Sequence, residues 1–212
     1  MKTLVSLFAV FFVTTSFILQ APQTAQAVTF RRPLNQVLNP AISYYYDTNA
    51  TASMARYNCA QDKVYNNHRG TDFRAVVGTN IYAAAGGGIF QKNDGCPTYG
   101  FWGSACGGGY GNHVRLDHEA PENDGRGWVS IYGHMKLGTA TQLINVAVNC
   151  GTLIGKTGSS GNSTGPHMHF EVRKYAYPGN DPFLGACSRP LSFWTRVGAN
   201  GVPTTECSAN AC

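Results

Sequence analysis

Apolar and polar side chains alternate over short stretches, and glycine-rich turns separate these stretches along most of the chain. The clearest alternation runs from 167 to 173, where every second side chain is apolar. A period of two is typical of a strand with one buried face. The same reasoning predicts strands at 73–77, 81–85, 113–117, 128–135, 143–148, 152–154 and 167–174. Since neither a helical period nor an internal repeat is found, we expect a mainly β fold of antiparallel sheets, with a groove between long loops.

Two long loops interrupt these strands. The first runs from 91 to 112, and a loop of that length without regular structure is more often functional than idle. It carries aromatic side chains between Cys96 and Cys106. They could form either a wall that contacts a ligand or a local hydrophobic cluster on the surface. The second loop, at 155–166, is rich in glycine and serine, and we expect it to be flexible.

The first 27 residues form a separate unit. Lys2 precedes an apolar run from 4 to 19, and the unit ends in Ala25-Gln26-Ala27. A positive start, a short apolar run and an A-x-A site predict a secretory signal peptide at 1–27 rather than a membrane anchor. We expect the rest of the chain to form a leader at 28–58 that packs on or near the groove, a single main domain at 59–187, and a short cysteine-containing, disulfide-stapled tail at 188–212.

Composition excludes several protein classes. Charged residues make up 13% of the 212 positions and hydrophobic ones 43%, which is too apolar for a disordered chain. The 25 glycines show no three-residue period, so collagen is excluded. The net charge of +5 is scattered rather than gathered in a patch, which argues against nucleic-acid binding and favours an anionic surface. After the signal peptide, no apolar run is long enough to span a membrane.

All 7 cysteines follow the signal peptide, and disulfides persist in oxidising compartments. No C-x-x-C motif occurs, so zinc-finger and thioredoxin-like sites have no support and structural bridges are expected. Because Cys96 and Cys106 lie in one loop, we predict that they pair.

Histidines carry the candidate chemistry. Of the 6 in the chain, His167 and His169 share one face of a predicted strand, about 7 Å apart. Alone this pair is weak evidence, since two surface histidines would look the same. His68 and Asp72 would be about 13 Å apart on an extended strand, too far to bind one zinc ion. Both can be ligands if the backbone bends at Gly70, the residue best able to allow it.

A further histidine, His134, lies near the end of the predicted strand at 128–135. By alternation we expect it to face the same way as Ser130 and Tyr132. Each of these histidines alone is best explained as a structural polar residue with its hydrogen bonds made. Their occurrence together points to a metal or catalytic site.

Taken in order, these blocks resemble the lysostaphin-type zinc metallo-endopeptidases, the LytM and beta-lytic group. The resemblance covers about 67–173, and its most specific part is the glycine-serine loop that leads into the histidine pair. The matching blocks are HRGTD at 68–72, VGTNIYAAAGG at 77–87, GNHVRLDH at 111–118, YGHM at 132–135 and GNSTGPHMHFEV at 161–172.

The resemblance implies a secreted or periplasmic enzyme that binds one Zn²⁺ through His68, Asp72 and His169. It implies that His134 and His167 are catalytic; we expect His167 to be the general base and His134 to stabilise the oxyanion, although the roles could be exchanged. Three protein ligands leave a catalytic zinc its fourth position. The expected substrate is bacterial cell-wall peptidoglycan, cut in its cross-links at Gly-Gly or D-Ala-containing bonds by a chain that acts as a monomer.

Three alternatives stay open. The first is a non-catalytic regulator of cell-wall amidases, although such relatives typically lack part of the ligand set. The second is a zinc enzyme like the D-Ala-D-Ala carboxypeptidases, in which the first ligand pair is more widely spaced. The third is an adhesive secreted β domain, which would leave the constellation as coincidence. Around the groove, aromatic faces are expected from Tyr44, Tyr45, Tyr46 and Trp102.

Overall fold

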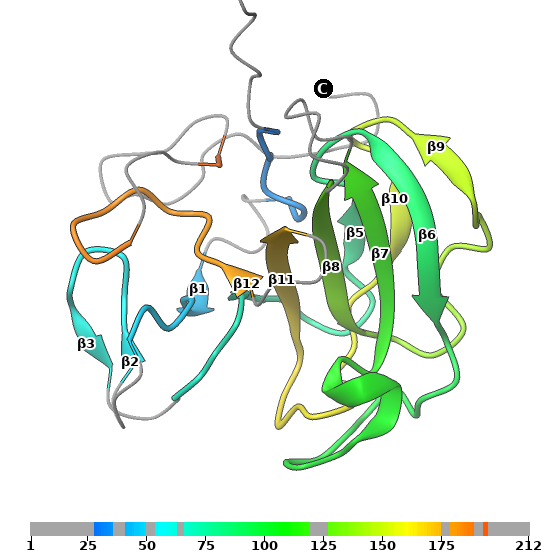
Figure 1. Ribbon diagram of the computed structural model, residues 1–212. Coiled ribbons are helices and arrows are strands. Elements are labelled where there is room, and N and C mark those ends of the chain that lie inside the picture. Colours follow the sequence, from blue (N-terminus) through cyan, green and yellow to red (C-terminus); the bar gives the residue numbers. More distant parts are fainter. Residues whose placement is uncertain are drawn as a thin grey trace, which may run out of the picture.

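One antiparallel sheet organises the structure, a computed structural model that describes residues 28–35, 41–49, 54–62, 66–118, 127–174, 179–188 and 193–194. The strand order is β1-β4-β11-β8-β7-β6-β9, and β12 pairs with β11. In Figure 1, β1 lies on one side of β11, and β8, β7 and β6 follow on the other; β4 pairs with β11 on the side of β1. The strands are β1 (Ile42–Tyr44), β4 (Thr71–Arg74), β6 (Gly87–Asn93), β7 (Asn112–His118), β8 (Trp128–Met135), β9 (Val146–Val148), β11 (His167–Lys174) and β12 (Gly179–Asn180).

Smaller elements complete the fold. Strands β5 (Asn80–Tyr82) and β10 (Leu153–Lys156) form a two-stranded sheet, and β2 (Met54–Ala55) pairs with β3 (Gln61–Asp62). A short 3-10 turn, η1 (Cys106–Gly109), is the sole helical element of the described residues. The predicted mainly β class with antiparallel sheets is therefore confirmed. In the part of the chain that the structure describes, no helix is long and apolar enough to cross a membrane.

The strands with the strongest patterns lie where the sequence places them. Strand β8 is buried along its whole length, and β11 buries the apolar positions of its alternation. The glycine-rich strand β6 was not predicted, because glycine has low β-propensity and weakens the pattern. It takes the first residues of the loop expected at 91–112, so that loop is shorter than predicted.

The core lies on the face of β11 that carries Phe170. This ring packs edge-on against Tyr132 of β8 and Phe30 of the leader, with centroids 5.3 and 5.5 Å away. The leader therefore contributes to the core as well as to the sheet, through β1. A disulfide joins Cys59 to Cys187, the two ends of the main domain expected from the sequence. The signal peptide predicted at 1–27 and most of the tail predicted at 188–212 lie outside the described residues.

Candidate metal centre and active-site groove

Three buried side chains converge where β4 and β11 pair. The ring of His169 places Nδ1 2.8 Å from Oδ1 of Asp72, its cross-strand partner. The ring of His68, from the turn before β4, places Nε2 3.1 Å from the same oxygen and 3.2 Å from His169 Nδ1. All three ligand atoms lie within 4.8 Å of one another, close enough to hold one metal ion.

A backbone bend brings His68 to Asp72. The chain turns at 66–67 and bends at Gly70 before β4 begins, as the ligand hypothesis required. Gly70 is needed for a second reason: a Cβ there would lie 2.6 Å from Cε1 of His169 and 2.6 Å from the carbonyl oxygen of Phe170. Any larger residue at position 70 would displace the His169 ring.

The proton positions in this cluster fit a cation. His68 Nδ1 lies 2.7 Å from the carbonyl oxygen of Tyr45, so Nδ1 carries the proton and donates it. In the neutral ring, Nε2 then presents a lone pair toward the carboxylate of Asp72. Two acceptors facing each other at 3.1 Å repel unless a proton or a metal ion lies between them. Histidine and carboxylate donors suit zinc.

Charge interactions keep the central carboxylate ionised. Burial alone would raise the pKa of Asp72, but the nearby imidazoles of His68 and His167 hold it well below its ordinary value. Burial has the opposite effect on a histidine and by itself would lower the pKa of His169. The hydrogen bonds and negative charges of Asp72 and Glu171 outweigh burial and raise that pKa to about 9. Protons and a metal ion therefore compete for the same ligand atoms.

A carboxylate and a phenol support His169 from behind. Its outward nitrogen, Nε2, is buried and lies 3.6 Å from Oε2 of Glu171. The hydroxyl of Tyr110 donates a short hydrogen bond to the same Glu171 oxygen. The period of two that puts His167 and His169 on one face of the strand puts Glu171 there as well, and this continued alternation, H-x-H-x-E, is the sequence signal for it.

Two further imidazoles stand beside the cluster. The rings of His134 and His167 have centroids 4.6 Å apart, and His134 is 5.7 Å from His169. Each Nδ1 lies within 2.8 Å of a carbonyl oxygen, that of Ser160 for His134 and that of Gly165 for His167. In both rings Nδ1 is therefore the donor, and Nε2 of the neutral ring is left to accept a proton. Burial, then the neighbouring imidazoles, holds the pKa of His134 well below its ordinary value.

A bulge turns His134 into the site. Between Asn112 and Val114 the register of β7 against β8 shifts, and His134 adopts a φ of 58°. Its N–H donates to the carbonyl of Tyr110 at 2.8 Å. The expectation that it faces the same way as Tyr132 was wrong: Tyr132 packs on the core face with Phe170, while His134 meets His169 on the other. A bulge reverses the alternation beyond it.

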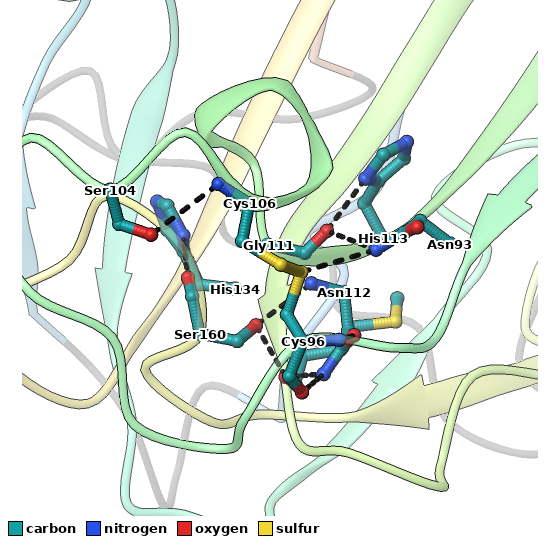
Figure 2. Close-up of a disulfide and its surroundings, with 10 residues drawn as sticks. Asn93, Cys96, Ser104, Cys106, Gly111, Asn112, His113, His134 and Ser160 are labelled. Atoms are coloured by element: carbon teal, nitrogen blue, oxygen red, sulfur yellow. Dashed lines mark hydrogen bonds between the residues drawn. A yellow bond between two sulfur atoms is a disulfide. The ribbon is translucent and has the colours of Figure 1, made fainter.

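The predicted disulfide between Cys96 and Cys106 is confirmed, and Figure 2 shows how it connects to His134. The side chain of Asn112 accepts from the Cys96 N–H at 2.7 Å and donates to its carbonyl at 2.8 Å. The Asn112 N–H then donates to the hydroxyl of Ser160, whose carbonyl accepts from His134. A chain of hydrogen bonds therefore connects the bridged loop to the ring of His134.

The glycine-serine loop is packed rather than free. Most of residues 157–163 are buried, and Gly158 N–H donates to the carbonyl of His134 at 2.9 Å. Gly161 adopts a φ of 75° and lies so close to Gly111 that neither has room for a side chain. The flexibility expected from composition is therefore not what the structure shows: glycine here permits close backbone packing.

A groove of about 920 Å³ opens onto this cluster. Tyr44 of β1 and Trp102 of the bridged loop line it, as expected, but Tyr45 is buried and packs against Phe183. The lining residues are Ala41, Ser43, Tyr44, Asp72, Arg74, Ala75, Val76, Val77, Tyr99, Trp102, Asn162, Ser163, Thr164, Gly165, Pro166 and His167. The aromatic loop residues therefore form a groove wall, one of the two alternatives left open by the sequence.

Comparison with known proteins agrees with this geometry. The model of peptidase family M23 matches residues 66–181. The DD-carboxypeptidase/endopeptidase Mpg of Neisseria meningitidis is 34% identical over 113 residues, 53% of this chain and 21% of its own length. The glycyl-glycine endopeptidase ALE-1 of Staphylococcus capitis is 31% identical over 147 residues, 66% of this chain and 35% of its own.

Solved structures similar to this chain include the catalytic domain of lysostaphin from Staphylococcus simulans, which is 25% identical to it and superposes with a TM-score of 0.46. That match covers 67% of this chain and 88% of the lysostaphin domain. The chain thus spans well under half the length of these curated relatives, although it spans most of this catalytic domain.

Proposed function

The chain belongs to peptidase family M23, and from that premise we propose that it is a zinc metallo-endopeptidase that hydrolyses peptide bonds in peptidoglycan cross-links. The observation that carries the proposal is the convergence of His68, Asp72 and His169 beside two further imidazoles at one groove. A non-catalytic regulator has no need of a complete ligand set. Support for the substrate class comes from relatives named as peptidoglycan or glycyl-glycine endopeptidases.

In this proposal His68, Asp72 and His169 hold one Zn²⁺. Zinc bound there supplies an acidified water and polarises the scissile carbonyl. The protein's own contribution is to keep Asp72 ionised, to hold each imidazole in one tautomer and to enclose the cluster so that bulk water does not compete.

The two remaining imidazoles, those of His134 and His167, carry out the proton transfers. His167 lies at the groove surface, and we assign its Nε2 as the general base that takes a proton from the attacking water. His134 can donate from Nε2 to the developing oxyanion only after it takes a second proton from solvent, because the one proton of the neutral ring sits on Nδ1. The exchanged assignment is a second candidate, favoured by the low pKa of the buried His134, because a neutral ring is ready to accept a proton.

A related activity has its own support. One relative is named as both a DD-carboxypeptidase and an endopeptidase, so release of a terminal D-alanine is the second candidate reaction. We also propose that residues 1–27 direct export, that the enzyme acts outside the cytoplasmic membrane as a monomer, and that the scattered positive charge favours the anionic wall.

The test is digestion of purified peptidoglycan followed by mass analysis of the products. Two walls are compared, one cross-linked through glycine bridges and one directly through D-alanine. An endopeptidase splits cross-linked dimers into two peptide fragments, whereas a carboxypeptidase releases one amino acid and leaves the dimers intact. Metal analysis of the same preparation should give one zinc per chain, and activity should disappear with a chelator and return with zinc. A fully metallated protein that leaves both walls intact would contradict the proposal.

A further inference from the structure

Arg74 places a positive charge in the groove, next to the metal centre. It is the last residue of β4, on the same strand face as Asp72, since side chains two positions apart point the same way. Its cross-strand partner is His167. The Arg74 side chain is exposed and lines the groove, whereas Asp72 is buried in the ligand cluster.

The charge of Arg74 is not used by the fold. Its backbone N–H donates to the carbonyl of Ala41 at 3.0 Å, but within the described residues its guanidinium makes no hydrogen bond or ion pair. Among the residues that line the groove it is the one lysine or arginine. The one carboxylate there, that of Asp72, is engaged by imidazoles. An anion entering the groove would therefore find Arg74 free.

The surroundings of Arg74 strengthen such an interaction. The next three lining residues along the chain, Ala75, Val76 and Val77, are apolar. Apolar walls lower the local dielectric constant, so an ion pair formed beside them is stronger than one in open solvent. The planar guanidinium can bind a carboxylate through two parallel hydrogen bonds, which a lysine cannot do.

We propose that Arg74 is a specificity-determining residue that selects peptides carrying a free carboxylate within about two residues of the scissile bond. The inference rests on the proposed endopeptidase function and narrows its substrate class. The distance follows from the strand: Asp72 and Arg74 are about 6.8 Å apart along β4, and an extended peptide advances about 3.4 Å per residue. A carboxamide at the same substrate position offers one acceptor and no charge.

The test uses matched pairs of cross-link peptides that differ by one carboxylate or carboxamide, placed on either side of the scissile bond. We expect wild-type kcat/KM to be about 10–100-fold higher for the carboxylate member of one pair. Arg74→Gln should reduce that ratio to near one, keep activity on the carboxamide peptide within about threefold and retain the zinc. Arg74→Lys should keep part of the preference, because it restores charge without the planar fork. The control is Lys156→Gln, which removes the same charge from an exposed position of β10 that does not line the groove.

A second measurement separates this inference from the proposed function. Reduced-amide analogues of the same peptides cannot be hydrolysed, and their Kd for the zinc-loaded protein is measured by calorimetry. If binding prefers the carboxylate and Arg74→Gln abolishes the preference, the inference holds even when no peptide is cleaved, in which case the endopeptidase function fails alone. Equal wild-type affinity for both members of every pair overturns the inference. So does an Arg74→Gln variant that weakens binding of carboxylate and carboxamide peptides equally.

Discussion

Glu171 should set the zinc affinity of the site without touching the ion. It faces Nε2 of His169 at 3.6 Å, while the opposite nitrogen, Nδ1, faces the other ligands. When Nδ1 binds a metal ion, the ring proton must sit on Nε2, and the Glu171 carboxylate, 3.6 Å away, is the nearby negative charge that favours a proton there. Tyr110 holds that carboxylate in place through its own hydroxyl. Two substitutions, Glu171→Gln and Tyr110→Phe, therefore perturb the support of a ligand and leave the ligands intact.

The magnitude follows from this geometry. Removing an outer partner of a metal-binding histidine typically costs 10–100-fold in metal affinity. Glu171→Gln keeps an amide oxygen that can accept from Nε2 but removes the charge, so we expect about 10-fold weaker zinc binding. Tyr110→Phe keeps the charge of Glu171 but removes the hydrogen bond that orients its carboxylate, so we expect a smaller loss of zinc affinity, about 3–10-fold, because this bond acts on His169 only through Glu171.

Competition with a zinc chelator at fixed pH measures the dissociation constant directly, and circular dichroism confirms that each variant is folded. The control is Ser130→Ala in β8, the strand next to β11. It removes a buried hydroxyl that is hydrogen-bonded to His118 of β7, on the core face of the sheet. It should lower the free energy of unfolding and leave the zinc affinity unchanged. The reasoning is refuted if Glu171→Gln binds zinc as tightly as wild type, or if Ser130→Ala weakens binding equally.

Three further predictions address the ligands, the bridge and acid stability. His169→Ala should lose zinc, whereas His167→Ala should keep it and lose hydrolysis by about 10²-fold or more; metal analysis and peptide kinetics check this, and the reverse pattern would show that the two histidines are misassigned. Replacing Cys96 and Cys106 together by serine should lower the free energy of unfolding by about 3 kcal/mol in urea titrations, and an unchanged midpoint would contradict it. Burial lowers the pKa of His118 from 6.5 to about 4, so the folded state disfavours the protonated ring. The contribution of neutral His118 to the free energy of unfolding is therefore fully present above pH 6.5 and falls by about 2–3 kcal/mol toward pH 4.5. His118→Gln should reduce this loss, and urea unfolding at pH 6.5 and at pH 4.5 measures it.

The sequence alone determined the features that depend on neighbours along the chain. The alternation at 167–174 set which side chains of β11 face the site, because successive residues of a strand point to opposite faces. The need for a bend at Gly70 followed from the reach of an extended chain, and the pairing of Cys96 with Cys106 from their position in one loop. Each of these is a local property.

Tertiary structure decided what depends on distant segments. Asp72 meets His169 across 97 residues because β4 pairs with β11 in one register, and no local pattern fixes that register. The bulge that turns His134 toward the site arises where β7 and β8 fall out of step, so alternation along β8 alone gave the wrong face. The contact between Tyr110 and Glu171 likewise requires the bridged loop to fold back onto the sheet. A strand's own sequence sets which side chains share a face, but its partners decide what those side chains meet.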